Sequence, residues 1–109
     1  MNARRGIFVP PFDELVEPRT LVDLARRAEQ RGWDGFFPID LPDPAAVTTI
    51  VEELAELRPT DAGAFDLVVE IAPGDPVEPW AAAGATWVLT DFDSQPRLRE
   101  VEAAIDAGP

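Results

Sequence analysis

The chain has 109 residues, of which 46% are hydrophobic, and this length allows one small domain with a modest core. Its formal net charge is −12, and residues 33–109 carry sixteen acidic residues against three arginines, so we expect no nucleic-acid partner. Histidine, cysteine, lysine and tyrosine are all absent, which excludes imidazole bases, thiolates, Schiff-base lysines and phenol acids from the chemistry of a single chain.

The chain contains no stretch typical of a membrane or targeting segment. No apolar run approaches the roughly 20 residues that span a bilayer. The start, Met1 to Arg5, leads into a run that is too short and too rich in proline for a secretory signal. We therefore expect a cytoplasmic domain with no membrane attachment. The acidic excess has a plain interpretation as solvated helix faces that keep the protein in solution.

The first half of the chain predicts a strand, a helix and a second strand. Residues 6–9 are an apolar run that two prolines stop, which suits a buried strand. A helix is expected from Pro18, with Gly32 placed to end it as the residue after the cap. The strand at 33–39 is apolar almost throughout, as in a sheet covered on both faces. The helix has one apolar stripe at helical spacing: Leu21, Leu24, Ala25 and Ala28.

The second half continues the same alternation. Asp43 and Pro44 are a typical N-cap and first residue of a helix, and Pro59 ends that helix. The segment 73–79 is too rich in proline for a long helix, so only a short one is expected. The expected elements are a helix at 44–58, a strand at 65–72, a short helix at 79–83 before Gly84, a strand at 85–90, and a helix opened by Ser94 and Pro96 with the stripe Leu98, Val101 and Ile105.

Such regular alternation with tight connections predicts an α/β fold with parallel strands and right-handed crossovers. Four strand–helix units amount to half of a (β/α)8 TIM barrel, whose full form needs about 250 residues. We expect residues 1–109 to form one such domain, with helices on one face of the sheet.

Two blocks of the sequence resemble the luciferase-like monooxygenase family. Gly6 to Phe12 (GIFVPPF) and Gly32 to Phe37 (GWDGFF), ending at Asp40, are similar to the family's amino terminus. Phe65 to Glu70 (FDLVVE), Ala83 to Trp87 (AGATW) and the closing Ala107 to Pro109 (AGP) are similar to its carboxyl terminus. The blocks cover residues 1–41 and 50–109. The family's central barrel strands have no counterpart in this chain.

The resemblance implies a strongly shortened barrel in which the first two and last two strands are joined directly. The first and last strands of a closed barrel are neighbours, so the resemblance implies the strand order 2-1-4-3. One face and both edges of such a sheet would be open, and proteins cover or pair such surfaces. We therefore expect a homodimer in which two copies close an eight-stranded barrel. A gene fragment that folds poorly alone is the alternative.

The resemblance also implies a coenzyme, FMN or a deazaflavin, and candidate residues to bind it. Asp40 follows the strand 33–39 and is the candidate catalytic residue, but Leu41 stands where the family often has histidine. Asp91 holds the equivalent place after the strand 85–90, and Phe12 lies in the loop after the first strand. The resemblance therefore implies coenzyme contacts from Phe12, Asp40 and Asp91. Asp40 equally suits a capping role before Pro42.

Three functions stay open from the sequence. The first is a shortened oxidoreductase of the monooxygenase type, with an incomplete site and weak or absent catalysis. The second is a non-catalytic remnant, or an assembly partner of a full-length relative, that binds no coenzyme. The third is a small acidic domain with metal-dependent activity, for which Glu70 and Asp91 are a weak candidate pair because two carboxylates lack a third ligand. We assign no metal site.

Overall fold

Four strands and four helices alternate along the chain, as the sequence predicts. The computed structural model describes residues 3–10, 17–38, 41–92 and 95–109. All three strand pairs are parallel, so the predicted α/β class with a parallel sheet is confirmed. The strands are β1 (Gly6–Val9), β2 (Gly35–Pro38), β3 (Asp66–Ile71) and β4 (Trp87–Thr90), and the helices are α1 (Pro18–Gln30), α2 (Pro44–Leu57), α3 (Glu78–Ala83) and α4 (Leu98–Ala107).

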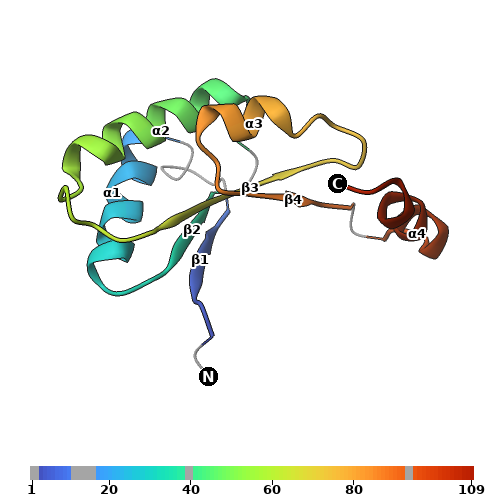
Figure 1. The fold of residues 1–109 in the computed structure, drawn as a ribbon, viewed down its shortest axis with the longest axis horizontal. Helices are drawn as coiled ribbons and strands as arrows, with labels where there is room; N and C mark the ends of the chain where they lie inside the picture. Colours follow the sequence, from blue (N-terminus) through green and yellow to red (C-terminus); the bar gives the residue numbers. More distant parts are fainter. Residues whose placement is uncertain (1–2, 11–16, 39–40, 93–94) are drawn as a thin grey trace.

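The order of the strands in the sheet is β1-β2-β3-β4, so the predicted order 2-1-4-3 is wrong. The connecting helices α1, α2 and α3 lie on one side of the sheet (Figure 1), so right-handed crossovers carry the chain across the sheet in one direction, and short connections join neighbouring strands. The predicted order 2-1-4-3 requires the first and last strands to pair, as they do in a closed barrel. In this sheet β1 and β4 do not pair. β1 and β4 are the free edges of this sheet, and the half-barrel stays a prediction.

Helices α1, α2 and α3 lie on one side of the sheet, whereas α4 lies apart beyond the end of β4 (Figure 1). None of the residues of α4 is buried. No helix in the described part of the chain is long and apolar enough to cross a bilayer. The core lies between the sheet and the helices, and its buried members are Val9, Leu21, Val22, Ala25, Phe36, Val47, Ile50, Leu54, Leu67 and Val69.

Local sequence signals set the ends of the helices as predicted. The backbone N–H of Gly32 donates to the carbonyl of Glu29, and that of Trp33 donates to Ala28, which is the pattern of a Schellman cap. Gly32 has a φ of 90°, a conformation that glycine adopts at little cost. At the start of α2, the Asp43 carboxylate accepts from the N–H of Ala46 at 3.0 Å. These caps fix where the chain turns back into the next strand.

Candidate functional site

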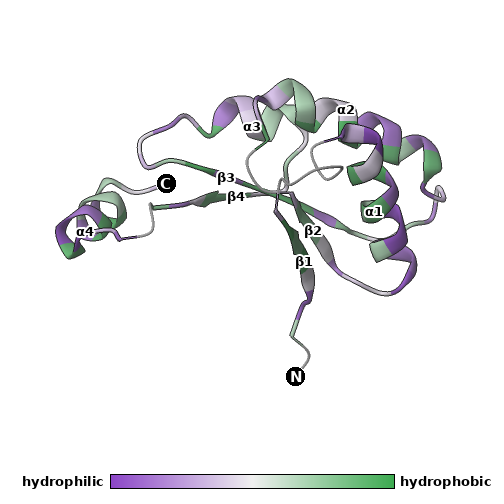
Figure 2. Cartoon of the chain, turned by 180° about the vertical axis from the view of Figure 1, so that it is seen from behind, coloured by the Kyte–Doolittle hydropathy of each residue, from purple (hydrophilic) through white to green (hydrophobic). Residues whose placement is uncertain are grey.

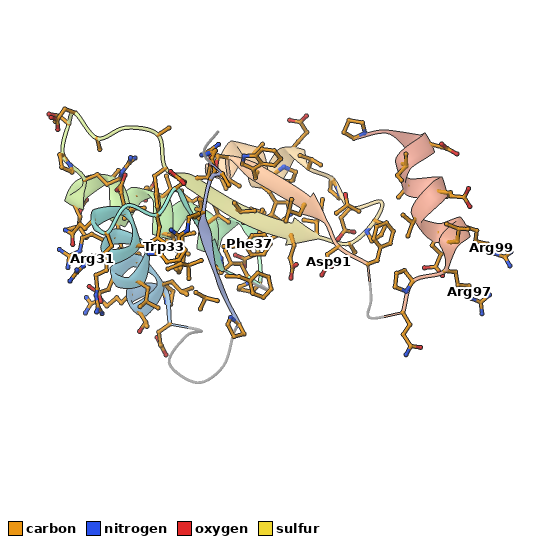
Figure 3. All side chains as sticks on the ribbon, turned by 90° about the horizontal axis from the view of Figure 1, so that it is seen from below. Arg31, Trp33, Phe37, Asp91, Arg97 and Arg99 are labelled. Atoms are coloured by element: carbon orange, nitrogen blue, oxygen red, sulfur yellow. The ribbon has the colours of Figure 1, made fainter. Side chains whose placement is uncertain are left out.

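Of the three predicted site residues, only one lies in the described part of the chain. Phe12 and Asp40 fall outside the described residues, so their predicted approach to a coenzyme stays a prediction. Asp91 follows β4 and is exposed, and Figure 3 labels it at the end of that strand. Its backbone N–H donates to the carbonyl of Ile71 at 2.8 Å, which prolongs the ladder between β3 and β4. Asp91 therefore marks the carboxyl end of the sheet.

The predicted pair of Glu70 and Asp91 is offset along the strands. The register places Glu70 beside Leu89, so Asp91 lies two residues further along β4. In the described ranges, no group of three or more acidic residues is arranged to hold a metal ion. The geometry thus adds no third ligand to the two carboxylates, and a metal-dependent activity gains no support from this edge of the sheet.

One uncovered apolar surface is the side of the sheet that faces away from the helices. Alternate residues of all four strands point there, and we call this surface the open face. Phe8 is 61% exposed and Trp87 is 55% exposed, although both lie within strands. Figure 2 shows hydrophobic stretches along the strands and on α4. The apolar residues of the open face are Phe8, Phe37, Val68, Trp87 and Leu89, and Glu70 lies on the same face beside Leu89.

The sheet register arranges these side chains in rows. Phe8 lies beside Phe37, and their ring centroids are 4.9 Å apart with the planes tilted by 35°. Val68 lies beside Trp87, one strand further on. In a parallel sheet, neighbours in register point to the same side, so the aromatic and aliphatic groups form one continuous strip across the four strands.

A groove of about 330 Å³ follows the open face. At its amino end, Gly6 and Gly35 lie side by side in β1 and β2 and leave the backbone without side chains. A Cβ atom added at Gly35 would lie 3.1 Å from the Cβ of Asp66, which is closer than ordinary packing allows. Glycine at this position therefore lets β3 approach β2 and deepens the groove. Its volume is at the lower end of the range for small-molecule sites.

Polar residues line the amino end of the groove. Arg4 forms an ion pair with Asp66. The hydroxyl of Thr86 donates to the Asp66 carboxylate at 3.0 Å and accepts from the N–H of Leu67 at 2.9 Å. This network ties the starts of β3 and β4 together and holds the Asp66 carboxylate at the rim. The chemistry-bearing edge predicted from the sequence is the opposite, carboxyl edge.

A second tie holds β1 to the turn before β2. The backbone N–H of Arg5 donates to the Asp34 carboxylate at 2.7 Å, and the N–H of Asp34 donates to the carbonyl of Arg5 at 2.8 Å. The Arg5 guanidinium lies 5.0 Å from the centre of the Trp33 ring, within reach of a cation–π contact. Sequence reasoning missed this rim. Its signal is a polar residue at or just before the start of each strand: Arg5, Asp34, Asp66 and Thr86.

Helix α4 presents a second uncovered apolar surface. Leu98 is 75% exposed and Ile105 is 71% exposed, and with Val101 they form the stripe that the sequence predicts. We call these three residues the α4 stripe. A space of about 1110 Å³ separates α4 from β4 and from the loop after β3. The helix therefore has the pattern of a packed element but no partner in the described part of this chain.

A third surface lies on the helix side of β1, at the opposite end of the sheet. A groove of about 350 Å³ runs between β1 and α1, and we call it the β1/α1 groove. Ile7, Val9 and Leu24 contribute to its apolar part. Arg27 and Arg31 stand at its rim. Arg27 also contacts Asp23 of its own helix at 3.7 Å, an exposed pair of little energetic weight.

Comparisons with known proteins give no independent identification. No protein-family model matches the chain, and no curated protein matches it either. The resemblance to luciferase-like monooxygenases therefore stands on the quoted residues alone.

Proposed function

We propose that this chain is an assembly module, whose open face is a binding surface for another protein surface that completes its core. The single observation that carries this proposal is the continuous strip from Phe8 across Phe37 and Val68 to Trp87. Parallel sheets are almost always covered on both faces. Helices cover only one face here, so the second layer must come from outside the described fold.

The continuity of the uncovered apolar strip supports a specific contact. With aromatic side chains of about 150–250 Å², Phe8 and Trp87 together leave roughly 250 Å² in contact with water. Val68, Leu89 and Phe37 extend the same strip. Contiguous patches of this kind mark interaction sites on soluble proteins. The polar rim around Asp66 bounds the strip at its amino end, as polar residues bound the core of a protein interface.

The experiment compares Leu89→Glu with Arg99→Glu as a charge-changing control on an exposed position. The measurements are binding of a hydrophobic fluorescent dye, accessibility of Trp87 to iodide in a W33F/W80F background, and molecular mass in solution. We expect the wild-type face either to bind the dye or to be hidden by association, and Leu89→Glu to abolish whichever is seen. A wild-type protein that stays monomeric, binds no dye and has a fully accessible Trp87 would contradict the proposal.

A second candidate function is coenzyme binding by a shortened luciferase-like oxidoreductase. The aromatic groove favours it, since Phe8, Phe37 and Trp87 offer flat apolar walls to a planar ring. Phe12, Asp40 and Asp91 would then contribute contacts from the carboxyl end, and Asp40 would act as a carboxylate base or hydrogen-bond acceptor.

Titration with FMN and with a deazaflavin, followed by quenching of coenzyme fluorescence, tests this second function. We expect Asp40→Asn to weaken binding if the carboxylate meets the ring, whereas Asp75→Asn, in an exposed loop, serves as the control. If the associated form of the protein binds neither coenzyme, the coenzyme-binding function is contradicted and the assembly function stands alone.

A further inference from the structure

We infer that the surface completing this module is a second copy of the chain, which seats its α4 stripe in the β1/α1 groove. This inference rests on the proposed function and names its partner. It joins three features that the fold leaves open: the β4 edge, the α4 stripe and the β1/α1 groove. Each is described above from its own residues, and one symmetric contact covers all three.

The free edges allow two copies to pair without disturbing either fold. β1 and β4 are both four residues long, and both run in the same direction in the sheet. A two-fold rotation about an axis parallel to the strands keeps every strand parallel. When each sheet turns through half a circle, this rotation brings β4 of each copy beside β1 of the other, so both free edges find a partner of matching length.

The position of α4 follows from the same rotation. A crossover helix packs against the strand that comes next in the sheet, as α1 does against β2 and α3 does against β4. Helix α4 has no next strand in the described sheet, which explains why its stripe is exposed. When β1 of a second copy lies beside β4, it becomes that next strand. Ile7, which is on the helix side of β1 and only partly buried, then belongs to the surface on which α4 packs.

The β1/α1 groove has the chemistry to receive this helix. Its apolar residues match the α4 stripe, and its rim carries Arg27 and Arg31. On a helical projection, Glu102 and Asp106 flank the stripe, since they follow Val101 and Ile105 at successive positions. Two carboxylates on the helix thus face two guanidinium groups on the groove. This charge complementarity favours a copy of this chain over an apolar segment without acidic flanks.

Helix α4 does not reach the β1/α1 groove of its own chain. Figure 3 shows Arg31 at one end of the molecule and Arg97 and Arg99, next to and within α4, at the other. Figure 1 likewise shows α4 beyond β4 and α1 beside β1 and β2, at opposite ends of the molecule. The described sheet of four strands separates the two surfaces. The α4 stripe and the β1/α1 groove are complementary but lie at opposite ends of one chain, so they can meet only between two copies.

The first test measures mass against concentration by sedimentation for wild type, Ile105→Glu and Ala103→Glu. Ile105 belongs to the stripe, whereas Ala103 is exposed on the opposite side of the same helix, so both variants add one negative charge to α4. We expect wild type to reach twice the chain mass of 11.9 kDa, Ile105→Glu to weaken dimerisation by at least about tenfold, and Ala103→Glu to change it little.

A charge exchange tests the seat of the helix itself. Arg27→Glu with Arg31→Glu is expected to weaken the dimer, and addition of Glu102→Arg with Asp106→Arg is expected to restore it. If the two arginine substitutions merely destabilised the fold, the two further substitutions on α4 would not restore the dimer. Recovery of the dimer in the fourfold variant therefore identifies a direct contact between these residues. A dimer that is insensitive to the arginine changes, or that is not restored by the exchange, overturns the α4 seat.

Disulfide trapping gives a readout that does not depend on affinity. The chain has no cysteine, so single substitutions introduce the only thiols. Equal amounts of Arg27→Cys and Glu102→Cys protein, mixed and oxidised, should form a disulfide between the two chains. Arg27→Cys with Ala103→Cys should not. Equal trapping in the two mixtures contradicts the inference.

The outcomes separate this inference from the proposed function. If wild type is monomeric but binds the dye through Leu89, the open face is a binding surface and the second copy is wrong. If Leu89→Glu breaks the dimer but Ile105→Glu does not, the two copies associate through the open face. The proposed contact of the α4 stripe with the β1/α1 groove is then wrong. If neither substitution changes association or dye binding, both proposals fail.

Discussion

The two ends of this chain contain the same structural unit in different surroundings. In the β1-α1-β2-α2 region, α1 lies against β2 and against α2, and buried residues of both helices belong to the shared core. In the β4-α4 region, the strand has the same apolar character and the helix has the same spacing of apolar residues, but α4 has no buried residue. The difference teaches that amphipathic patterning prepares a helix for packing, and that a neighbouring strand decides whether packing occurs.

Truncation of one isoleucine in each region tests this difference and should give the largest change in the free energy of unfolding. Ile50 in α2 is fully buried, whereas Ile105 in α4 is 71% exposed. We expect Ile50→Ala to lower the free energy of unfolding by about 2–5 kcal/mol, because it removes buried methylenes and leaves a cavity. Ile105→Ala should change it by less than about 0.5 kcal/mol in dilute solution. Urea unfolding followed by circular dichroism measures both, and equal losses would mean that α4 packs on its own chain.

Gly84 joins the packed region to β4, and its substitution has the next largest effect. Its φ is +117°, and an added Cβ would lie 2.8 Å from a methyl group of Val51 in α2. Gly84→Ala should therefore destabilise the fold by about 1–3 kcal/mol through strain and overlap together. Gly32→Ala is the control, because Gly32 has a φ of +90° but no atom within 4 Å of the added Cβ. A thermal-melt difference between the two variants isolates the overlap, and identical melts would exclude it.

An ion pair joins α1 to the end of α2, and its removal should have a smaller effect on the free energy of unfolding. The guanidinium of Arg58 donates to both oxygens of Glu29, at 2.8 Å and 2.7 Å, and also to the carbonyl of Gly63. The pair is partly buried, so Arg58→Ala should lower the free energy of unfolding by about 1–2 kcal/mol. Arg99→Ala, on exposed α4, should have no measurable effect. If Arg58→Ala matches this control in chemical denaturation, the bidentate contact does not stabilise the helix pair.

The smallest expected effect concerns the link between β3 and β4. Thr86→Val keeps the shape of the side chain but removes the hydroxyl that accepts from Leu67 and donates to Asp66. A loss of about 1 kcal/mol is expected, since one hydrogen-bonded group is removed and its partners stay near water. Hydrogen exchange should show faster exchange at the Leu67 amide and unchanged exchange in α1. Uniform acceleration across the chain would indicate instead that β4 belongs to the same cooperative unit as α1.

Much of the fold was predictable because the determining signals are local. The caps at Gly32 and Asp43 are made by hydrogen bonds between residues three to five positions apart, and both caps were predicted. The strand order was not, because it rested on a resemblance that implied barrel closure. The crossover rule, applied to four consecutive units, gives the observed order without any family assumption.

The candidate site was less predictable, because side-chain direction depends on register. Phe36 and Phe37 are adjacent in sequence, yet Phe36 is buried under the helices and Phe37 belongs to the open face. An apolar run therefore does not reveal how many of its faces are covered within the chain. The network of Arg4, Asp66 and Thr86 was missed for a related reason, since it joins residues 20 to 62 positions apart.

The two free edges of the sheet also bear on the number of copies in an assembly. In the proposed parallel pairing, a β1 edge meets a β4 edge, so every added copy would offer a fresh edge until the ring closes. The rotation between neighbouring copies, and therefore the twist of the four strands, sets the ring size. A sheet that turns through half a circle closes with two copies, whereas a flatter one continues as a filament. For the proposed assembly, the number of copies would therefore depend on the curvature of the backbone as well as on the side chains of the contact.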